Sequence, residues 1–336
     1  MKNFGSFLVV FIFLFSCKSD DETIKTNLLE LQKTYVSMSG TIGLYDALTF
    51  VMNDTAFIGM GTNFLGEDKH FYYYVPKYGT WEKIENEFPG DFRREMVAFA
   101  IGNKAYVGLG YTGGIPGDWT KHCCDDFFVY DNKTQGWESL AFEFPGKARW
   151  GAVAFTLNGK GYVGTGMTEE KDCLMDFYEF DPQVGWKRIP DIYNPRYRAN
   201  AFVANGYAYV CFGYLYGDIM SGSNDNIQRY DPVANKWEQQ LVTYEDKKSG
   251  DVLKVDRAIS FVINKDGEDF VYVGMGNIPD VNLSSKGWGY NPRENVWKIV
   301  DSLAVGLYGF SVEGNGYIMG VQGGSVFEAY TFRAED

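Results

Sequence analysis

Arginines recur at one spacing in this sequence of 336 residues. Arg93, Arg149 and Arg196 each stand six residues before a Phe that follows an Ala. An arginine fork binds a carboxylate through two parallel hydrogen bonds, so these residues could form a site for an anion or a sugar carboxylate. They could instead bond carbonyls and Asp side chains inside the fold, and recurrence at a fixed position favours that structural role. The predicted cluster also includes Arg94, Trp150, Arg198 and Arg257.

A second group of residues suits the binding of a sugar. Segment 111–125 combines Tyr111, Trp119 and His122 with glycines and a proline, and Tyr216 lies in a comparable segment farther along the chain. Exposed aromatic rings can stack on the C–H faces of sugar rings. Trp119 could equally pack inward as an anchor of its loop, and both interpretations stay open.

The cysteines suggest a disulfide and no metal centre. Cys123 and Cys173 each stand three residues before an Asp that opens a strand, and export would favour their oxidation. We predict a Cys123–Cys173 bridge, with Cys124–Cys173 or a strained Cys123–Cys124 bridge as alternatives. Cys211 replaces a recurring glycine and is predicted to be a buried thiol. Because adjacent His122, Cys123 and Cys124 cannot converge on one tetrahedral ion, and no cofactor motif occurs, we predict no metal and no cofactor.

These residues are carried on a repeated unit. Residues 88–110 and 144–166 have nearly the same sequence, and the marker Phe recurs six times at intervals of 47 to 59 residues. After each Phe come a turn, a strand with a central aromatic residue and a third strand, often ending in Tyr-Asp-Pro. In five units a fourth strand then begins at a Trp. The markers are Phe50, Phe99, Phe155, Phe202, Phe261 and Phe310, and Trp81, Trp137, Trp186, Trp237 and Trp297.

This pattern resembles the kelch repeat, in which each unit of about 50 residues forms one blade of a β-propeller. In particular, the chain is similar to kelch lipoproteins of Bacteroidetes that are called galactose-oxidase-like. The resemblance covers nearly all of residues 28–336 and implies an all-β, six-bladed propeller. Because the last unit has only three strands, we expect residues 27–38 to close its blade, with Leu31 or Tyr35 at the Trp position. The copper-ligand segments of galactose oxidases have no match here.

Loop lengths indicate which face of the propeller is functional. Hairpins between strands one and two, and three and four, are short, whereas loops between strands two and three are long. Long loops tend to carry function. The connections between blades emerge on the same side, which we call the long-loop face. We therefore expect Arg93, Arg149 and Arg196 to form a partial ring around the entrance of the central channel, with segment 111–125 on the same face.

The N-terminus has the pattern of an export signal. The apolar run at residues 7–15 is too short to span a bilayer, and residues 1–16 fit a signal peptide. The residues before Cys17 resemble a bacterial lipobox, which implies that Cys17 is lipidated; ordinary secretion, with Cys17 unmodified, is the alternative. Residues 17–27 form an acidic tether similar to the surface-export signal of Bacteroidetes lipoproteins. We expect an outer-membrane lipoprotein that faces the periplasm or the cell surface and touches the membrane only through its lipid.

Charge and motifs narrow the function to two classes. The net charge of −13 and the absence of basic runs argue against nucleic-acid binding. The favoured class is a monomeric, non-catalytic module that binds a glycan or a partner protein through the long-loop face. The alternative resembles the kelch sialate epimerases and would use a carboxylate and the arginine cluster on a sugar acid. The first is favoured because no catalytic constellation is visible and a fold alone does not fix a reaction.

Overall fold

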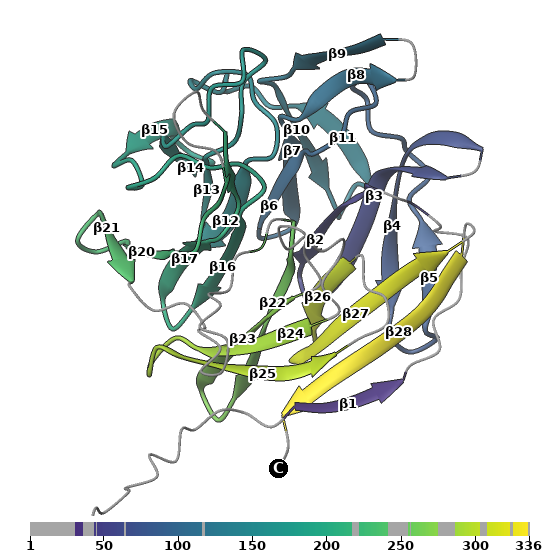
Figure 1. The fold of residues 1–336 in the computed structure, drawn as a ribbon. Helices are drawn as coiled ribbons and strands as arrows, with labels where there is room; N and C mark the ends of the chain where they lie inside the picture. Colours follow the sequence, from purple (N-terminus) through teal and green to yellow (C-terminus); the bar gives the residue numbers. More distant parts are fainter. Residues whose placement is uncertain are drawn as a thin grey trace, which may run out of the picture.

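The computed structural model is a closed ring of six antiparallel sheets, each of four strands, around a central channel (Figure 1). No helix occurs among the described residues, so none of them forms a helix long and apolar enough to cross a membrane. The predicted signal peptide, Cys17 and the acidic tether lie outside the described residues. The structure describes residues 31–35, 44, 46–63, 65–115, 118–216, 222–240, 255, 257–274, 286–302, 308–322 and 325–334.

Each blade is a meander whose strands run in chain order from the channel outward, except for the last strand of blade 6. Blade 1 contains β2 (Leu48–Met52), β3 (Thr55–Asn63), β4 (Gly66–Val75) and β5 (Thr80–Lys83). Blade 2 contains β6 (Val97–Ile101), β7 (Lys104–Gly108), β10 (Phe127–Asp131) and β11 (Gly136–Ser139). Blade 3 contains β12 (Val153–Leu157), β13 (Lys160–Gly164), β14 (Phe177–Asp181) and β15 (Gly185–Ile189).

The second half of the ring repeats this plan. Blade 4 contains β16 (Asn200–Ala204), β17 (Tyr207–Cys211), β20 (Ile227–Asp231) and β21 (Lys236–Gln240). Blade 5 contains β22 (Ile259–Lys265), β23 (Glu268–Gly274), β24 (Lys286–Asn291) and β25 (Val296–Ser302). Blade 6 contains β26 (Tyr308–Val312), β27 (Asn315–Gln322), β28 (Ser325–Ala334) and β1 (Leu31–Tyr35).

Stacked aromatic rings explain why the marker Phe recurs. In every blade it lies directly opposite the central aromatic residue of the second strand. The six ring pairs are nearly parallel, with centroids 4.8 to 5.3 Å apart. Such a pair contributes about 0.5–1.5 kcal/mol beyond the area it buries. The next blade then covers the pair, as Phe180 of blade 3 does at 5.0 Å from Tyr106 of blade 2. The predicted repeat is thereby confirmed.

In blades 2, 3 and 4, a turn after the second strand contacts the connection that follows. Leu109, Thr165 and Phe212 have φ of 58°, 61° and 59°, a left-handed conformation that turns the chain out of the sheet. The glycine that follows then donates its N–H to the next connecting segment. Gly110 N–H, for example, bonds the carbonyl of Arg149 at 2.9 Å. Backbone hydrogen bonds therefore tie these three blades to the connections that follow them on the long-loop face.

The N-terminal strand closes the ring, as the sequence predicted. β1 pairs antiparallel with β28, and β26 contacts β2 of blade 1. The prediction for the Trp position was wrong, however. In blades 1 and 2 the Trp lies opposite the aromatic residue of the third strand that corresponds here to Phe332, and Phe332 lies opposite Lys33. Leu31 and Tyr35 instead face Ala334 and Tyr330, two residues to either side.

Two of the long loops are themselves small hairpins. In blade 2, β8 (Tyr111–Ile115) pairs with β9 (Asp118–Cys123), and in blade 4, β18 (Tyr214–Leu215) pairs with β19 (Gly222–Ser223). Figure 1 shows the β8–β9 hairpin projecting from the top of the ring. The backbone of Arg94, in the connection to blade 2, pairs with Tyr111 at the start of this hairpin. The hairpin is therefore tied at its base to the segment beside the channel.

Candidate functional site

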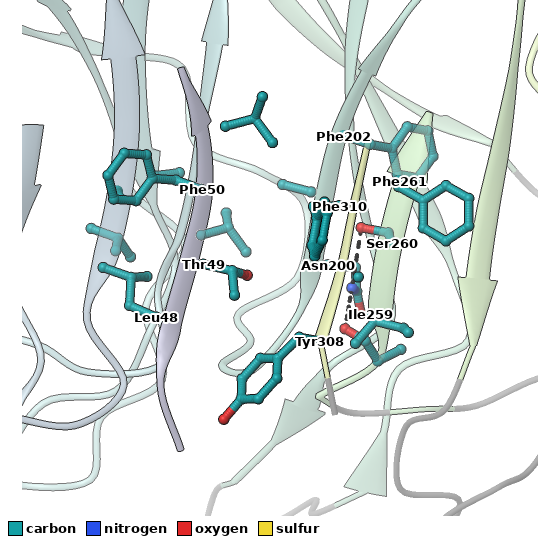
Figure 2. A pocket seen from close by; sticks show the side chains of 18 of the residues that line it. Leu48, Thr49, Phe50, Asn200, Phe202, Ile259, Ser260, Phe261, Tyr308 and Phe310 are labelled. Carbon is teal, nitrogen blue, oxygen red and sulfur yellow. Dashed lines mark hydrogen bonds between the residues drawn. The ribbon is translucent and has the colours of Figure 1, made fainter. Parts of the chain in front are cut away.

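The central channel encloses a cavity of about 560 Å³ lined by the innermost strand of each blade. Figure 2 shows Thr49, Asn200 and Ser260 among the apolar side chains of this lining. Asn200 donates from Nδ2 to the carbonyl of Ala258 at 2.5 Å and to Ser260 Oγ at 3.4 Å. This polar bridge links the innermost strands of blades 4 and 5 and leaves the channel open.

Charged residues gather where the channel opens on the long-loop face. They come from one repeat position, four residues before the marker Phe, where φ lies between 52° and 61°. Arg198 of the blade 4 connection donates to both carboxylate oxygens of Glu95, at 2.5 to 3.0 Å. Arg257 lies 3.8 Å from Glu95 and is 47% exposed. The residues at this position, which we call the mouth ring, are Asp46, Glu95, Gly151, Arg198 and Arg257.

The mouth ring contains Arg198 and Arg257, whereas the sequence predicted a partial ring of Arg93, Arg149 and Arg196 at the channel entrance. That prediction was wrong, because these three side chains are buried inside the fold. Glu95 was not predicted. It stands four residues before its marker Phe, as Arg198 and Arg257 do, and this shared position could have identified it from the sequence. Since Arg198 already pairs with Glu95, the guanidinium with the greater freedom to meet a ligand is Arg257.

Beside the mouth ring lies a pocket of about 440 Å³ between the loops of blades 2, 3 and 4. Its wall is a chain of aromatic rings. The centroids of Tyr111 and Trp150 are 5.6 Å apart, and those of Trp150 and Tyr197 are 5.1 Å apart, both edge to face. We call it the aromatic pocket, and its lining comprises Thr120, Lys121, Trp150, Met167, Thr168, Glu169, Lys171, Tyr197 and Tyr216.

The aromatic pocket contains some of the predicted residues and several that were missed. Trp150 lines the pocket, and Tyr111 packs against Trp150 from outside the lining. Both are almost fully buried, so neither ring is a free platform. Tyr216 is 44% exposed and offers an accessible ring. Lys121 was not predicted, because it lies in the inserted hairpin and follows no repeat pattern. Its ammonium lies 3.9 Å from the centroid of the Trp150 ring, and burial lowers its pKa.

Three predicted arginines lie inside the fold, so we exclude them from the candidate site. Arg93, Arg149 and Arg196 are at most 4% exposed. Arg149 forms a two-pronged pair with Asp176, at 2.6 and 2.9 Å, and also donates to the carbonyl of Thr165 at 3.1 Å. The carbonyl belongs to the left-handed residue that needs a donor there. The structural alternative raised by the sequence therefore describes these three residues, and the ligand-binding alternative does not.

The arginine of blade 4 repeats this arrangement without a carboxylate. Arg196 donates to the carbonyl of Phe212 at 3.1 Å and to Asn226 Oδ1 at 2.7 Å. Burial lowers its pKa to about 10. Burial acts to raise the pKa of Asp176, but Arg149 and the hydroxyl of Tyr178 outweigh it and hold that pKa below its usual value.

Arg94 and His122, which were also predicted, do not line the pocket. Arg94 lies 3.5 Å from Glu67 and donates to the carbonyl of Gly113 at 3.4 Å, which holds the hairpin from below. His122 is mostly exposed, 3.5 Å from Glu169. Trp119 belongs to β9, but its side chain lies outside the described residues, so its role stays a prediction.

The predicted disulfide is not formed in the structure, where Cys123, Cys124, Cys173 and Cys211 are all free thiols. Cys123 and Cys173 do approach the same apolar cluster around Met167, as neighbouring loops were expected to do. Cys173 Sγ accepts a hydrogen bond from Tyr216 N–H at 3.2 Å, and burial raises the pKa of Cys123 to about 12. Both thiols therefore serve as pocket-side packing groups here. Cys211 is a fully buried thiol, as predicted.

About half of the chain is similar to curated proteins. N-acetylneuraminate epimerase of Yersinia enterocolitica serotype O:8 / biotype 1B is 28% identical over 157 residues, which are 47% of this chain and 36% of the relative. Kelch-like protein 23 of Pongo abelii is 29% identical over 168 residues, 49% of this chain and 27% of the relative. The matches thus span about a third of the length of these relatives. No protein-family model matches the chain.

The fold has a counterpart among solved structures. The structure of YjhT matches with a TM-score of 0.64 over 87% of this chain and 97% of that one, at 15% identity, which shows a shared fold. The six blades, their common register and these similarities define the protein as a kelch-type β-propeller. Its likeness to lipoproteins of the Bacteroidetes type stays a prediction.

Proposed function

We propose that this propeller is a binding module that holds a glycan in the aromatic pocket of its long-loop face. The observation that carries the proposal is the pocket itself. Its volume of about 440 Å³ lies in the range of small-molecule sites, about 300–1,000 Å³. The lining joins the exposed ring of Tyr216 to hydroxyl, carboxylate and ammonium groups, which is the combination that a sugar needs.

A glycan array probed with the purified full-length protein tests this proposal. Tyr216→Ala should weaken binding of any glycan found by about tenfold, or 1.4 kcal/mol, and leave the melting temperature unchanged, because the side chain is half exposed. Tyr78→Ala is the matched control, since Tyr78 is 64% exposed in the β4–β5 turn, outside the pocket. An array with no glycan bound, or equal losses in the two variants, would contradict the proposal. Capture of a protein instead would favour the partner-protein alternative.

A second candidate is an enzyme that acts on a sugar acid. It is supported by the name of the Yersinia relatives and by the Glu95, Arg198 and Arg257 group at the channel mouth. Glu95 would have to leave Arg198 to exchange a proton with a sugar. Proton NMR of N-acetylneuraminic acid anomers would detect turnover, and Glu95→Gln should abolish it. Anomer exchange at the buffer rate with wild-type protein would exclude this candidate.

We also propose that the protein is exported and anchored through a lipid on Cys17. The support is the apolar run and the lipobox-like residues that precede it. Cys17→Ser should accumulate as unprocessed precursor, and labelling with a radioactive fatty acid should disappear. Label retained by the variant would contradict the anchor, and mature unlabelled wild-type protein would indicate ordinary secretion.

A further inference from the structure

Lys121 presents an ammonium group to the aromatic pocket. The residue reaches from β9 into the aromatic pocket, where its Nζ lies 4.2 Å from the ring centroid of Tyr111 and 3.9 Å from that of Trp150. Among the described residues, no Asp or Glu forms an ion pair with it. Aromatic faces attract a cation, yet they neutralise none of its charge.

The charges around Lys121 add to this imbalance. The charged side chains that act most strongly on its ammonium are Glu95, Arg198 and Arg257. Glu95 is already held by two hydrogen bonds from Arg198 Nε and a third from its Nη2. Three cations therefore face one carboxylate, in a protein whose net charge is −13. Glu169 and Lys171, both on the pocket lining, add one charge of each sign and leave this excess of positive charge unchanged.

We propose that Lys121 determines the specificity of the aromatic pocket by pairing with an anionic group of the bound glycan, a carboxylate or a sulfate ester. The inference rests on the proposed glycan-binding function. It adds that the ligand is negatively charged and that Lys121 recognises this charge. A half-buried ammonium in a pocket of this size gains a charge-assisted hydrogen bond from such a ligand. Lys121 lies on the inserted hairpin of blade 2. That hairpin would therefore select anionic over neutral glycans, while the repeated blades hold the pocket in place.

Paired ligands that differ only in charge test this inference with the full-length protein. The probes are oligogalacturonate against its methyl ester, and dextran sulfate against dextran, measured by calorimetry. Wild type should bind one anionic probe at least about tenfold more tightly than its neutral partner, and this preference should fall as salt is raised. In Lys121→Gln the ratio should approach one, whereas Lys121→Arg should retain it. Lys133→Gln, which removes the same charge from an exposed turn, should match wild type.

The outcomes separate this inference from the function on which it rests. If wild type binds charged and neutral probes equally, the glycan-binding function stands and the role of Lys121 is wrong. If neither probe of any pair binds, and the glycan array is also empty, both fall. If Lys121→Gln weakens charged and neutral probes alike and lowers the melting temperature, the ammonium only fastens the hairpin to its aromatic rings, which also overturns the inference.

Discussion

Arg196 and Arg198 stand two residues apart in one connecting segment and lie in opposite environments. Arg196 is fully buried and bonds the carbonyl of Phe212 inside blade 4, whereas Arg198 turns outward with φ of 55° and pairs with Glu95 across the channel mouth. The connection to blade 2 shows the same alternation, with Arg93 inside and Glu95 at the mouth. The position relative to the marker Phe, rather than the residue type, therefore decides the environment of a side chain. Six residues before the Phe it is buried in the blade, and four residues before the Phe it lies at the channel mouth.

The largest effect should follow from breaking a buried pair. Arg149→Ala leaves the carboxylate of Asp176, which is 15% exposed, without its guanidinium, and orphans the carbonyl of Thr165. Loss of one partner of a buried ion pair costs about 3–5 kcal/mol. Urea unfolding should show that loss. A variant as stable as wild type would mean that the buried arginines are not structural.

An intermediate effect should follow from making blade 3 resemble blade 4. Asp176→Asn replaces the carboxylate with the amide that Asn226 already provides to Arg196. We expect a loss of about 1.5–3 kcal/mol at neutral pH, the range of hydrogen bonds to charged groups.

That difference should depend on pH in one direction. The pKa of Asp176 is lower in the folded protein than in the unfolded chain, so its contribution is present above pH about 4 and is lost as the pH falls through the lower, folded value. Stability curves of wild type and Asp176→Asn should therefore converge in acid. Curves that stay parallel down to pH 3 would rule out the pairing as the cause.

The smallest effect should come from the mouth ring. Arg257→Ala removes a half-exposed side chain whose contact with Glu95 is 3.8 Å long, so stability should change by less than about 0.5 kcal/mol. The same urea titration measures it. A loss equal to that of Arg149→Ala would erase the distinction between the two arginine positions.

The six-bladed architecture could be predicted from the sequence because its blades repeat. The marker Phe occurs in all six blades since each must stack on the next strand, and its spacing alone located every blade. The partner of the buried arginines was also visible: Asp126, Asp176 and Asn226 precede their strands at one fixed position. This coincidence adds to the recurrence of the arginines, which already favoured the structural role over ligand binding.

The rest of the site could not be predicted because it does not repeat. Lys121 gains its position from the β8–β9 hairpin, whose sequence follows no repeat pattern, and its contact with Trp150 joins two blades through space. The Trp position of blade 6 was misassigned because pattern alone does not fix the register of a strand taken from the other end of the chain. Lys33 occupies it on a strand with no hairpin to set the alignment.

The pairing of Leu31 with Ala334 also sets an order of events. The two residues are about 300 positions apart, so the loop that must close is nearly the whole chain, and its entropic cost precedes any gain from the last sheet. Blades 1 to 5 can assemble from local hairpins, whereas blade 6 must wait until the final residues have been made. Until β1 pairs with it, β28 presents an open edge to other chains. β1 is thus made first and pairs last. The protein is most prone to aggregate while β28 is still unpaired.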